Sequence, residues 1–342
     1  MTWTAAGACA RGIGRYLLPL GVVLVPAVAG ACASRLLALH GDRRRRKATP
    51  GPTVQVRAGA ARPLPVLAAR GTVVSGRPSR RSPLRFFVLV YALSIPFWLV
   101  HALAPAYLPV DHLPVTDIGA TFVPMVAASL LVFREEGAGG VRRFLLRAVD
   151  LRRIGDRRWY LAVFGLMPLL YVLTYGVMRL AGLPVPTRYH VPRVAPFLYA
   201  VFLFAAAGEE LGYPGYATDP MQERWGAVPG ALLTGTVHAV WHYPSGYAMG
   251  QTPALMAWGS LLTITFRVLT VWLYTNTNRS VGATILFHAT TNTGRSVFPG
   301  SRPALELADG AVGHSIIALA AGMAAFLWGP TLARFRYART PA

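Results

Sequence analysis

The sequence carries little charge, and most of that charge is of one sign. Only 14% of the 342 residues are charged, and 13 acidic residues stand against 34 lysines and arginines, which gives a formal net charge of +21. Hydrophobic residues make up 54% of the chain, which is more than an ordinary soluble globular protein contains. These values exclude an ordinary soluble protein, and we expect a multi-pass protein of the cell membrane.

Cysteine is nearly absent as well. The two cysteines, Cys9 and Cys32, both precede the polar motifs described below. A disulfide framework and a cysteine-based zinc site are therefore excluded at those motifs. Any metal ion there would need histidine and carboxylate ligands.

Long apolar runs, by contrast, recur along the chain. Most contain roughly 18 to 23 residues, about the length that a helix needs to cross a ~30 Å hydrocarbon layer at 1.5 Å per residue. We therefore predict an all-α fold, a polytopic membrane helix bundle with eight core transmembrane helices. They are expected at residues 86–108, 115–133, 160–178, 194–215, 231–247, 255–275, 281–297 and 311–332. The run from Tyr16 to Ser34 predicts an additional N-terminal transmembrane helix, with a signal peptide as the alternative.

The positive charges gather between the apolar runs. Residues 41–85 contain the run from Arg43 to Lys47 and no apolar periodicity, which predicts a basic, disordered cytoplasmic linker near anionic lipid headgroups. Between Arg134 and Trp159, apolar residues recur at helical spacing and arginines occupy other positions of the helical wheel, which predicts an amphipathic helix on the membrane surface. This distribution follows the positive-inside rule. We therefore expect the lipid bilayer, and no nucleic acid, as a partner.

Two adjacent glutamates form the first polar motif within an apolar run. Glu209 and Glu210 are expected to end a transmembrane helix. Ionisable side chains inside a membrane are costly unless they are paired or hydrated, so both are candidates for function. Adjacent carboxylates repel each other, which favours uptake of a proton and suits a general base. The alternative is a pair that is simply solvated at the headgroups.

Two further apolar runs each carry a pair of polar residues four positions apart, which places both members on one helix face. His238 and His242 could ligate a metal ion or polarise water together with a glutamate. His288 and Asn292 could donate hydrogen bonds to the oxyanion that forms when water attacks a carbonyl. Each pair alone is also compatible with hydrogen bonding between packed helices. Together with the glutamates, they indicate one site shared by three helices.

In this chain order the motifs resemble those of the CPBP family of membrane proteases, which includes CAAX prenyl endopeptidases and bacterial abortive-infection-like proteins. The similarity covers about residues 195–297. The matching positions are Glu209 and Glu210, His238 and His242, and His288 and Asn292. In the second of these motifs, His238 stands where the family has a phenylalanine.

The chain departs from the family pattern after the glutamate pair, where Pro214 replaces an arginine. Arg267 lies within the predicted span 255–275, where an unpaired charge would be costly. We therefore predict that Arg267 takes over from the missing arginine and pairs with Glu210. The alternative is that its side chain reaches towards the headgroups.

The resemblance implies an intramembrane endopeptidase that hydrolyses a peptide bond in a membrane-associated protein or peptide. The implied catalytic residues are Glu209, His242, His288 and Asn292, and the supporting residues are Glu210, His238 and Arg267. The first two would activate water, and the other two catalytic residues would stabilise the oxyanion. The alternatives are a proton-coupled transporter and a non-proteolytic scaffold or immunity protein, and Pro214 supports the latter.

A metal-dependent mechanism is also open, because the family has often been described as metalloproteases. Glu209, His242 and His288 would then be the ligands of a Zn²⁺ ion. The H-E-x-x-H spacing of many zinc proteases is absent from the sequence. We expect the metal-free, glutamate-type mechanism.

The polar motifs define the expected organisation of the chain. The segments are a hydrophobic N-terminal segment (1–40), the linker (41–85), N-terminal transmembrane helices with the amphipathic helix (86–193), a CAAX protease-like catalytic core (194–298), and the last transmembrane helix with a basic cytoplasmic tail (299–342). The site is expected in the cytoplasmic half of the membrane, near the end of the helix that carries Glu209. A helix that started at Gly226 would place His242 about 24 Å from that side. The fifth span is therefore expected to start near Ala231, with residues 216–230 on the surface or re-entrant.

Overall fold

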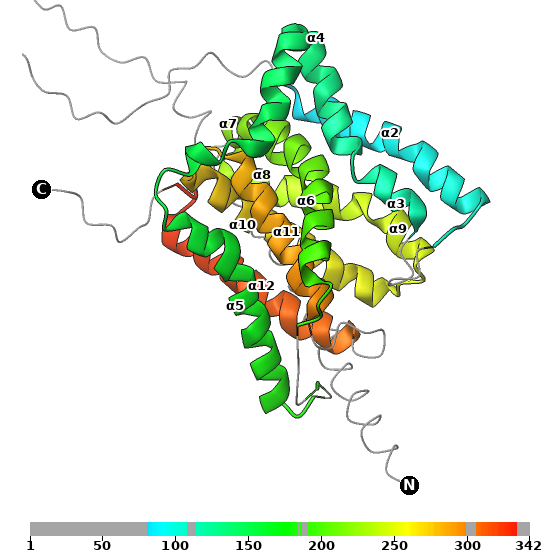
Figure 1. Ribbon diagram of the computed structural model, residues 1–342, viewed down its shortest axis with the longest axis vertical. Coiled ribbons are helices and arrows are strands. Elements are labelled where there is room, and N and C mark those ends of the chain that lie inside the picture. The colour runs from blue at the N-terminus through cyan, green and yellow to red at the C-terminus, as the bar shows by residue number, and fades with distance from the viewer. Residues whose placement is uncertain (1–80, 108–113, 184, 187–190, 299–305, 334–342) are drawn as a thin grey trace, which may run out of the picture. The chain divides into compact units, whose positions relative to one another are not determined.

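The computed structural model describes residues 81–107, 114–183, 185–186, 191–298 and 306–333 (Figure 1). The predicted N-terminal helix and residues 41–80 of the basic linker lie outside these residues. In the described part of the chain, helices are accompanied by one isolated bridge, between Tyr107 and Pro114. The predicted all-α fold class is confirmed.

Helices account for most of the described residues. In chain order they are α2 (Pro83–Leu103), α3 (Val115–Ala120), α4 (Val123–Leu145), η1 (Leu146–Val149), η2 (Leu151–Ile154), α5 (Trp159–Leu180), α6 (Ala195–Gly212), the π-helix η3 (Tyr213–Thr218), α7 (Asp219–Trp225), α8 (Ala227–Trp241), α9 (Tyr243–Ala248), α10 (Pro253–Asn276), α11 (Val281–Val297) and α12 (Glu306–Trp328). Among the described residues, 6 helical segments are long and apolar enough to cross a membrane, namely those that contain α2, α4, α5, α6, α10 and α12.

The two helices that carry the histidine motifs are shorter. α8 has 15 residues and α11 has 17, fewer than the roughly 20 that a membrane span needs. α8 packs along α10, and α11 packs against α6 and α5 (Figure 1). The predicted spans 231–247 and 281–297 therefore do contain helices, and longer helices flank both of them.

The helix that carries the glutamate pair does not end after it, contrary to our expectation. α6 continues through η3 into α7, so that residues 195–225 form one helical segment of 31 residues. Pro214 lacks an N–H group and cannot donate the α-helical hydrogen bond to Glu210 O, and the wider π-turn of η3 accommodates it without ending the helix. Residues 216–225 remain helical, and the placement of residues 216–230 on the surface or as a re-entrant segment stays a prediction.

The next helix also begins earlier than predicted. Gly226, with φ of 87°, forms the sharp turn between α7 and α8, a backbone conformation that glycine adopts without strain. α8 therefore starts at Ala227, not near Ala231. It ends at Trp241, and α9 follows directly after His242.

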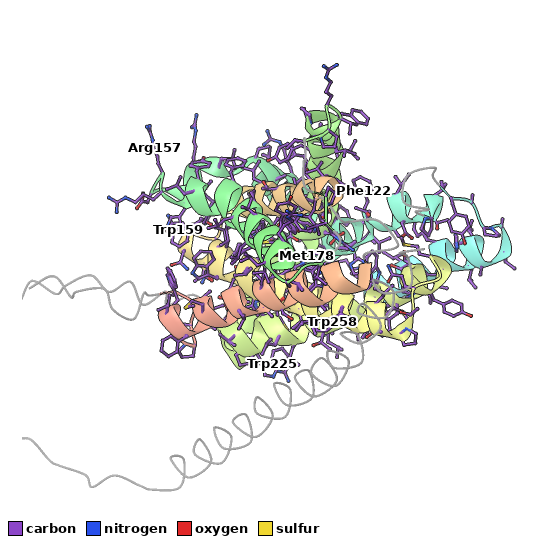
Figure 2. All side chains as sticks on the ribbon, turned by 90° about the horizontal axis from the view of Figure 1, so that it is seen from below. Phe122, Arg157, Trp159, Met178, Trp225 and Trp258 are labelled. Atoms are coloured by element: carbon purple, nitrogen blue, oxygen red, sulfur yellow. The ribbon has the colours of Figure 1, made fainter. Side chains whose placement is uncertain are left out.

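The arginine-rich segment after the second predicted span is not a single helix on the lipid surface. α4 runs on to Leu145 with a kink at Gly137 (φ 71°), and two short 3-10 turns follow it. Phe144 and Ile154 are each 2% exposed and belong to the protein core. The apolar face of this segment thus packs on other helices, while Arg157 points away from them in Figure 2. Periodicity revealed the apolar face but not what would cover it.

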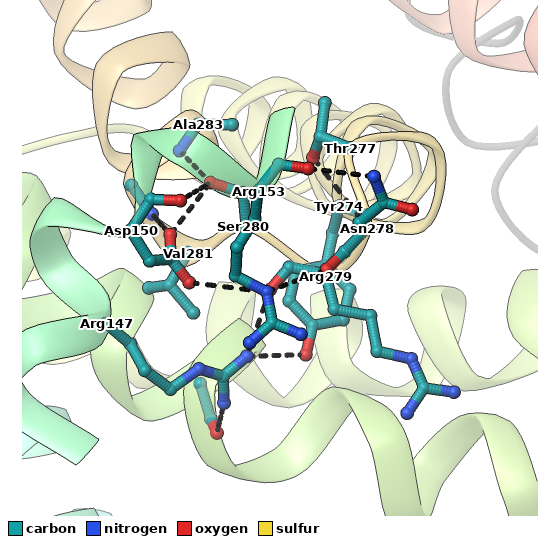
Figure 3. Close-up of polar contacts among 12 residues, drawn as sticks. Arg147, Asp150, Arg153, Tyr274, Thr277, Asn278, Arg279, Ser280, Val281 and Ala283 are labelled. Atoms are coloured by element: carbon teal, nitrogen blue, oxygen red, sulfur yellow. Dashed lines mark hydrogen bonds and ion pairs between the residues drawn. The ribbon is translucent and has the colours of Figure 1, made fainter. Parts of the chain in front are cut away.

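One of these arginines, Arg147, forms hydrogen bonds to η3 and to α10. Arg147 donates from Nη1 to Gly215 O at 2.7 Å and from Nη2 to Tyr274 Oη at 2.9 Å (Figure 3). Pro220 has no N–H group to offer Gly215 O in a π-helical register. The guanidinium therefore satisfies a carbonyl that the irregular helix leaves open, and it links η3 to α10.

Candidate active site

Glu209 and His238 meet between α6 and α8. His238 Nε2 lies 3.1 Å from Glu209 Oε2, and the two residues are 3% and 8% exposed. Arg267 Nη2 lies 3.2 Å from His238 Nδ1 on the other side of the ring. Because a guanidinium can only donate, Nδ1 accepts, and the ring proton resides on Nε2, facing Glu209. The protonation of His238 is thus fixed by its neighbours.

Glu210 forms the centre of a second buried cluster. Arg267 Nη1 donates to both carboxylate oxygens of Glu210, at 2.9 and 3.2 Å, and both side chains are 0% exposed. His288 Nδ1 lies 2.9 Å from Glu210 Oε1. The predicted ion pair between Arg267 and Glu210 is present, and the alternative in which Arg267 reaches towards the headgroups is wrong.

His242 forms the exposed edge of the cluster. Its ring centroid lies 4.7 Å from that of His238 and 5.0 Å from that of Trp241, and the residue is exposed. Trp241 is fixed by a hydrogen bond from its Nε1 to Ser94 Oγ at 2.7 Å. The site is therefore buried on the glutamate side and open at His242.

Asn292 lies one turn beyond His288 on α11. It is half-buried, and its side chain makes no hydrogen bond to another residue in the described ranges. The predicted site residues therefore differ in whether they contact the buried ion-paired cluster. His238, expected to support, is at the centre, whereas Asn292 lies outside the ion-paired cluster.

Glu209 and His242 lie at about the same distance along their helices from the turn at Gly226. Glu209 precedes the turn at Gly226 by 17 residues, and His242 follows it by 16. At 1.5 Å per residue, both are roughly 24–26 Å along their helices from this turn. The start of α8 directly after Gly226 therefore does not move His242 away from Glu209. The expected cytoplasmic placement assumed that Glu209 lies near a helix end, and this assumption is wrong.

Two residues that we did not single out shape the site. The Tyr213 ring lies 4.3 Å from the His238 ring, and Arg267 Cζ lies 4.9 Å above the Tyr213 ring. A Cβ at Gly235 would lie 2.7 Å from the Ile264 Cα, so only glycine allows α8 and α10 to approach closely enough to place Arg267 here. Tyr213 follows Glu209 by four residues, a spacing that could have identified it.

Two groups of side chains could hold a metal ion. The first is Glu209 with His238 and His242, and the second is Glu209 with Glu210 and His288, each with its ligand atoms within 4.8 Å of one another. Neither group is the predicted set of Glu209, His242 and His288. The buried cluster nevertheless has the residue types of a hydrolytic active site.

Comparison with known proteins places this cluster in a family. Residues 191–294 match the family model described as type II CAAX prenyl endopeptidase Rce1-like. No curated protein matches the sequence. The matched region begins shortly before α6, ends within α11, and contains all of the predicted site residues. The chain is therefore a multi-pass membrane protease whose residues 191–294 form a domain of the Rce1-like CAAX prenyl endopeptidase family.

Proposed function

We propose that the chain is a glutamate-type intramembrane endopeptidase, in which Glu209 and His242 activate the water that cleaves a membrane-associated protein or peptide. The supporting observation is the approach of Glu209, His238 and His242, whose ligand atoms lie within 4.8 Å of one another. A single water molecule can bridge atoms at that separation with ordinary hydrogen bonds. The exposed His242 gives this water a route to the substrate.

The buried charges balance if His288 carries a proton. Glu209, Glu210 and Arg267 together carry one net negative charge, and burial of uncompensated charge is costly. A protonated His288, paired through Nδ1 with Glu210, makes the cluster neutral. Its Nε2–H group is then a charged hydrogen-bond donor, and a ring nitrogen of His288 lies within 4.8 Å of a Glu209 oxygen.

The chemistry follows from these positions. Glu209 takes a proton from the water as the water oxygen bonds to the scissile carbonyl carbon, while His242 orients the water. The oxyanion of the tetrahedral intermediate accepts hydrogen bonds from His288 and from the Asn292 amide. Glu209 then passes its proton to the leaving nitrogen, the C–N bond breaks, and an acid and an amine are released. His238 and Arg267 hold the carboxylates in place.

The residues fit a resident metal ion poorly. In the first group, His238 Nδ1 accepts from Arg267, so its Nε2 bears the proton and cannot ligate a cation. A histidine ligand normally donates through its second nitrogen, which the donor guanidinium prevents here. In the second group, both oxygens of Glu210 are taken by Arg267. These contacts support the metal-free mechanism.

The test uses the full-length protein in liposomes with a library of fluorogenic membrane peptides in H₂¹⁸O. The wild type should cleave at least one peptide and incorporate ¹⁸O into the new carboxyl terminus. Glu209→Gln should lower kcat by about 10²–10⁴-fold. Glu223→Gln is the matched control, because Glu223 is an exposed carboxylate on α7, and it should retain full activity.

Two results would contradict the proposal. One is the absence of cleavage throughout the library, which would favour the non-proteolytic scaffold. The other is undiminished cleavage by Glu209→Gln. A transporter would instead acidify the liposomes in response to a solute gradient, and a pH-sensitive dye inside the liposomes detects this in the same samples.

A further inference from the structure

A cavity of about 420 Å³ lies next to the proposed active site but outside its charged cluster. Its walls come from the end of α2, the start of α3 and the whole length of α9. Most of the lining is aromatic, proline or alanine, and includes Trp98, Tyr107 and Tyr247. His101, Asp117 and Ser245 supply polar groups among them.

α9 connects this cavity to the catalytic edge. Ser245 follows His242 by three residues, and Gly246 N donates to His242 O at 2.9 Å within the same turn. Side chains at this spacing on a helix have Cβ atoms about 5–6 Å apart. Tyr107 Oη donates to Ala248 O at 3.0 Å and fixes the other end of α9. The cavity is thus one helical turn from the residue that would orient the attacking water.

The cavity contains polar atoms whose bonding capacity is not used. His101 is 9% exposed, and its Nδ1 has no hydrogen-bond partner among the described residues. Asp117 accepts a hydrogen bond from Ser245 Oγ, and in the described ranges no arginine or lysine forms an ion pair with it. Buried polar groups in folded proteins normally have hydrogen-bond or charge partners. A half-buried carboxylate without a counter-ion, beside a buried imidazole whose Nδ1 has no partner, therefore indicates a binding site for a ligand.

We infer that this cavity is a substrate subsite that receives a lysine or arginine side chain of the peptide, with Asp117 as its counter-ion. The inference rests on the proposed protease function. The carboxylate binds the cationic head, and His101 Nδ1 can accept one of its N–H bonds. Trp98, Tyr107 and Tyr247 surround the site with aromatic rings, which attract cations and cover the aliphatic stem.

The electrostatics of the cavity distinguish this occupant from others. An acidic side chain would be repelled by Asp117, and an apolar side chain would leave Asp117 without a counter-ion and His101 Nδ1 without a hydrogen-bond partner. A cation satisfies both groups at once. Because the cavity lies one turn from His242, the bound side chain belongs to a residue near the scissile bond, so the subsite determines where the chain is cut.

The test compares membrane peptides that differ at a single position near the cleaved bond, with lysine, glutamine or glutamate there. Wild type should cleave the lysine peptide with a kcat/KM roughly 10- to 100-fold above that for the glutamine peptide, the range expected of a charged hydrogen bond. Asp117→Asn, which can still accept from Ser245, should bring this ratio close to one while cleavage of the glutamine peptide is retained. Thr116→Val, an uncharged change in the same cavity wall, should leave the ratio unchanged.

A binding measurement separates failure of the subsite from failure of the proposed protease. In the Glu209→Gln background, fluorescence anisotropy should show tighter binding of the lysine peptide than of the glutamine peptide, and Asp117→Asn should abolish the difference. Preference in binding without any cleavage by the wild type would retain the subsite and reject the protease. Equal binding of all three peptides, or a preference that survives Asp117→Asn, overturns the inference. A third result also overturns the inference: n-butylammonium stabilises the protein, this effect depends on Asp117, and no peptide preference is seen. The cavity would then bind a small solute and not a side chain of the substrate.

Discussion

Replacement of Arg267 by methionine gives the sharpest test of how the site is held together. The change removes a guanidinium that makes two hydrogen bonds to Glu210, at 2.9 and 3.2 Å, and one to His238. Glu210 is 0% exposed and would keep only its contact with His288 Nδ1, at 2.9 Å. Because a buried carboxylate would lose its guanidinium partner, we expect Arg267→Met to lower the free energy of unfolding by about 3–5 kcal/mol.

A double-mutant cycle separates the pair from the loss of side-chain packing. Glu210→Gln removes the charge that Arg267 neutralises, so the double variant Glu210→Gln/Arg267→Met should be more stable than the two single losses predict. The expected coupling energy is about 2–3 kcal/mol. Equilibrium unfolding in mixed detergent micelles, followed by tryptophan fluorescence, measures all four proteins.

Arg143→Met is the matched control. Arg143 also pairs with a glutamate, Glu136, at 3.1 Å, but the two side chains are 69% and 36% exposed. Exposed pairs contribute about 0.2–1 kcal/mol, so this variant should be nearly as stable as the wild type. If Arg267→Met loses no more stability than Arg143→Met, or if the cycle shows no coupling, the assigned role of Arg267 is refuted.

Three further predictions follow from the packing and the connections. Gly212→Val should destabilise the protein by about 1–3 kcal/mol, because a Cβ there would lie 2.6 Å from α4. Gly259→Ala should leave the free energy of unfolding unchanged in the same equilibrium unfolding assay, because no atom lies within 4 Å of the added Cβ; equal losses would contradict the packing. Asp150→Ala should lower the unfolding free energy by about 0.5–2 kcal/mol, because its carboxylate caps the start of α11 (Figure 3), and unchanged stability would rule out that role. In a variant with both native cysteines replaced by serine, a membrane-impermeant maleimide added to whole cells should label Tyr247→Cys and not Arg157→Cys, because the positive-inside rule predicts that the basic connections face the cytoplasm; the reverse pattern would place the cavity inside.

The local chemistry of the sequence was sufficient for the fold class and for the helices that carry the polar motifs. Apolar runs of membrane-spanning length predicted helices at the right places, because hydropathy and helical rise are properties of a segment alone. The spacing of four residues likewise placed His238 with His242 on one face of α8. A charge in an apolar run requires a partner, which led from Arg267 to Glu210 before any contact was known.

The pairing within the site needed the tertiary structure. We expected Glu209 to act with His242, but His238 is the imidazole that lies against the carboxylate and is oriented by Arg267. Which face of α8 turns towards α6 depends on how the helices rotate against each other. That rotation is set by close contacts such as the one at Gly235, and no local pattern encodes it.

The sequence by itself therefore determined an all-α membrane protein with a glutamate, histidine and asparagine motif set, and it predicted the compensation for Pro214. Only the tertiary structure decided that the helix continues past Pro214 as a π-turn, and that α8 begins at Ala227. The physical reason is that a proline inside a helix removes one hydrogen bond of the α-helical ladder, but whether the chain then turns away or continues depends on distant partners. Here Arg147 and Tyr274, far along the chain from Gly215, stabilise the continued helix and so hold Glu209 level with His242.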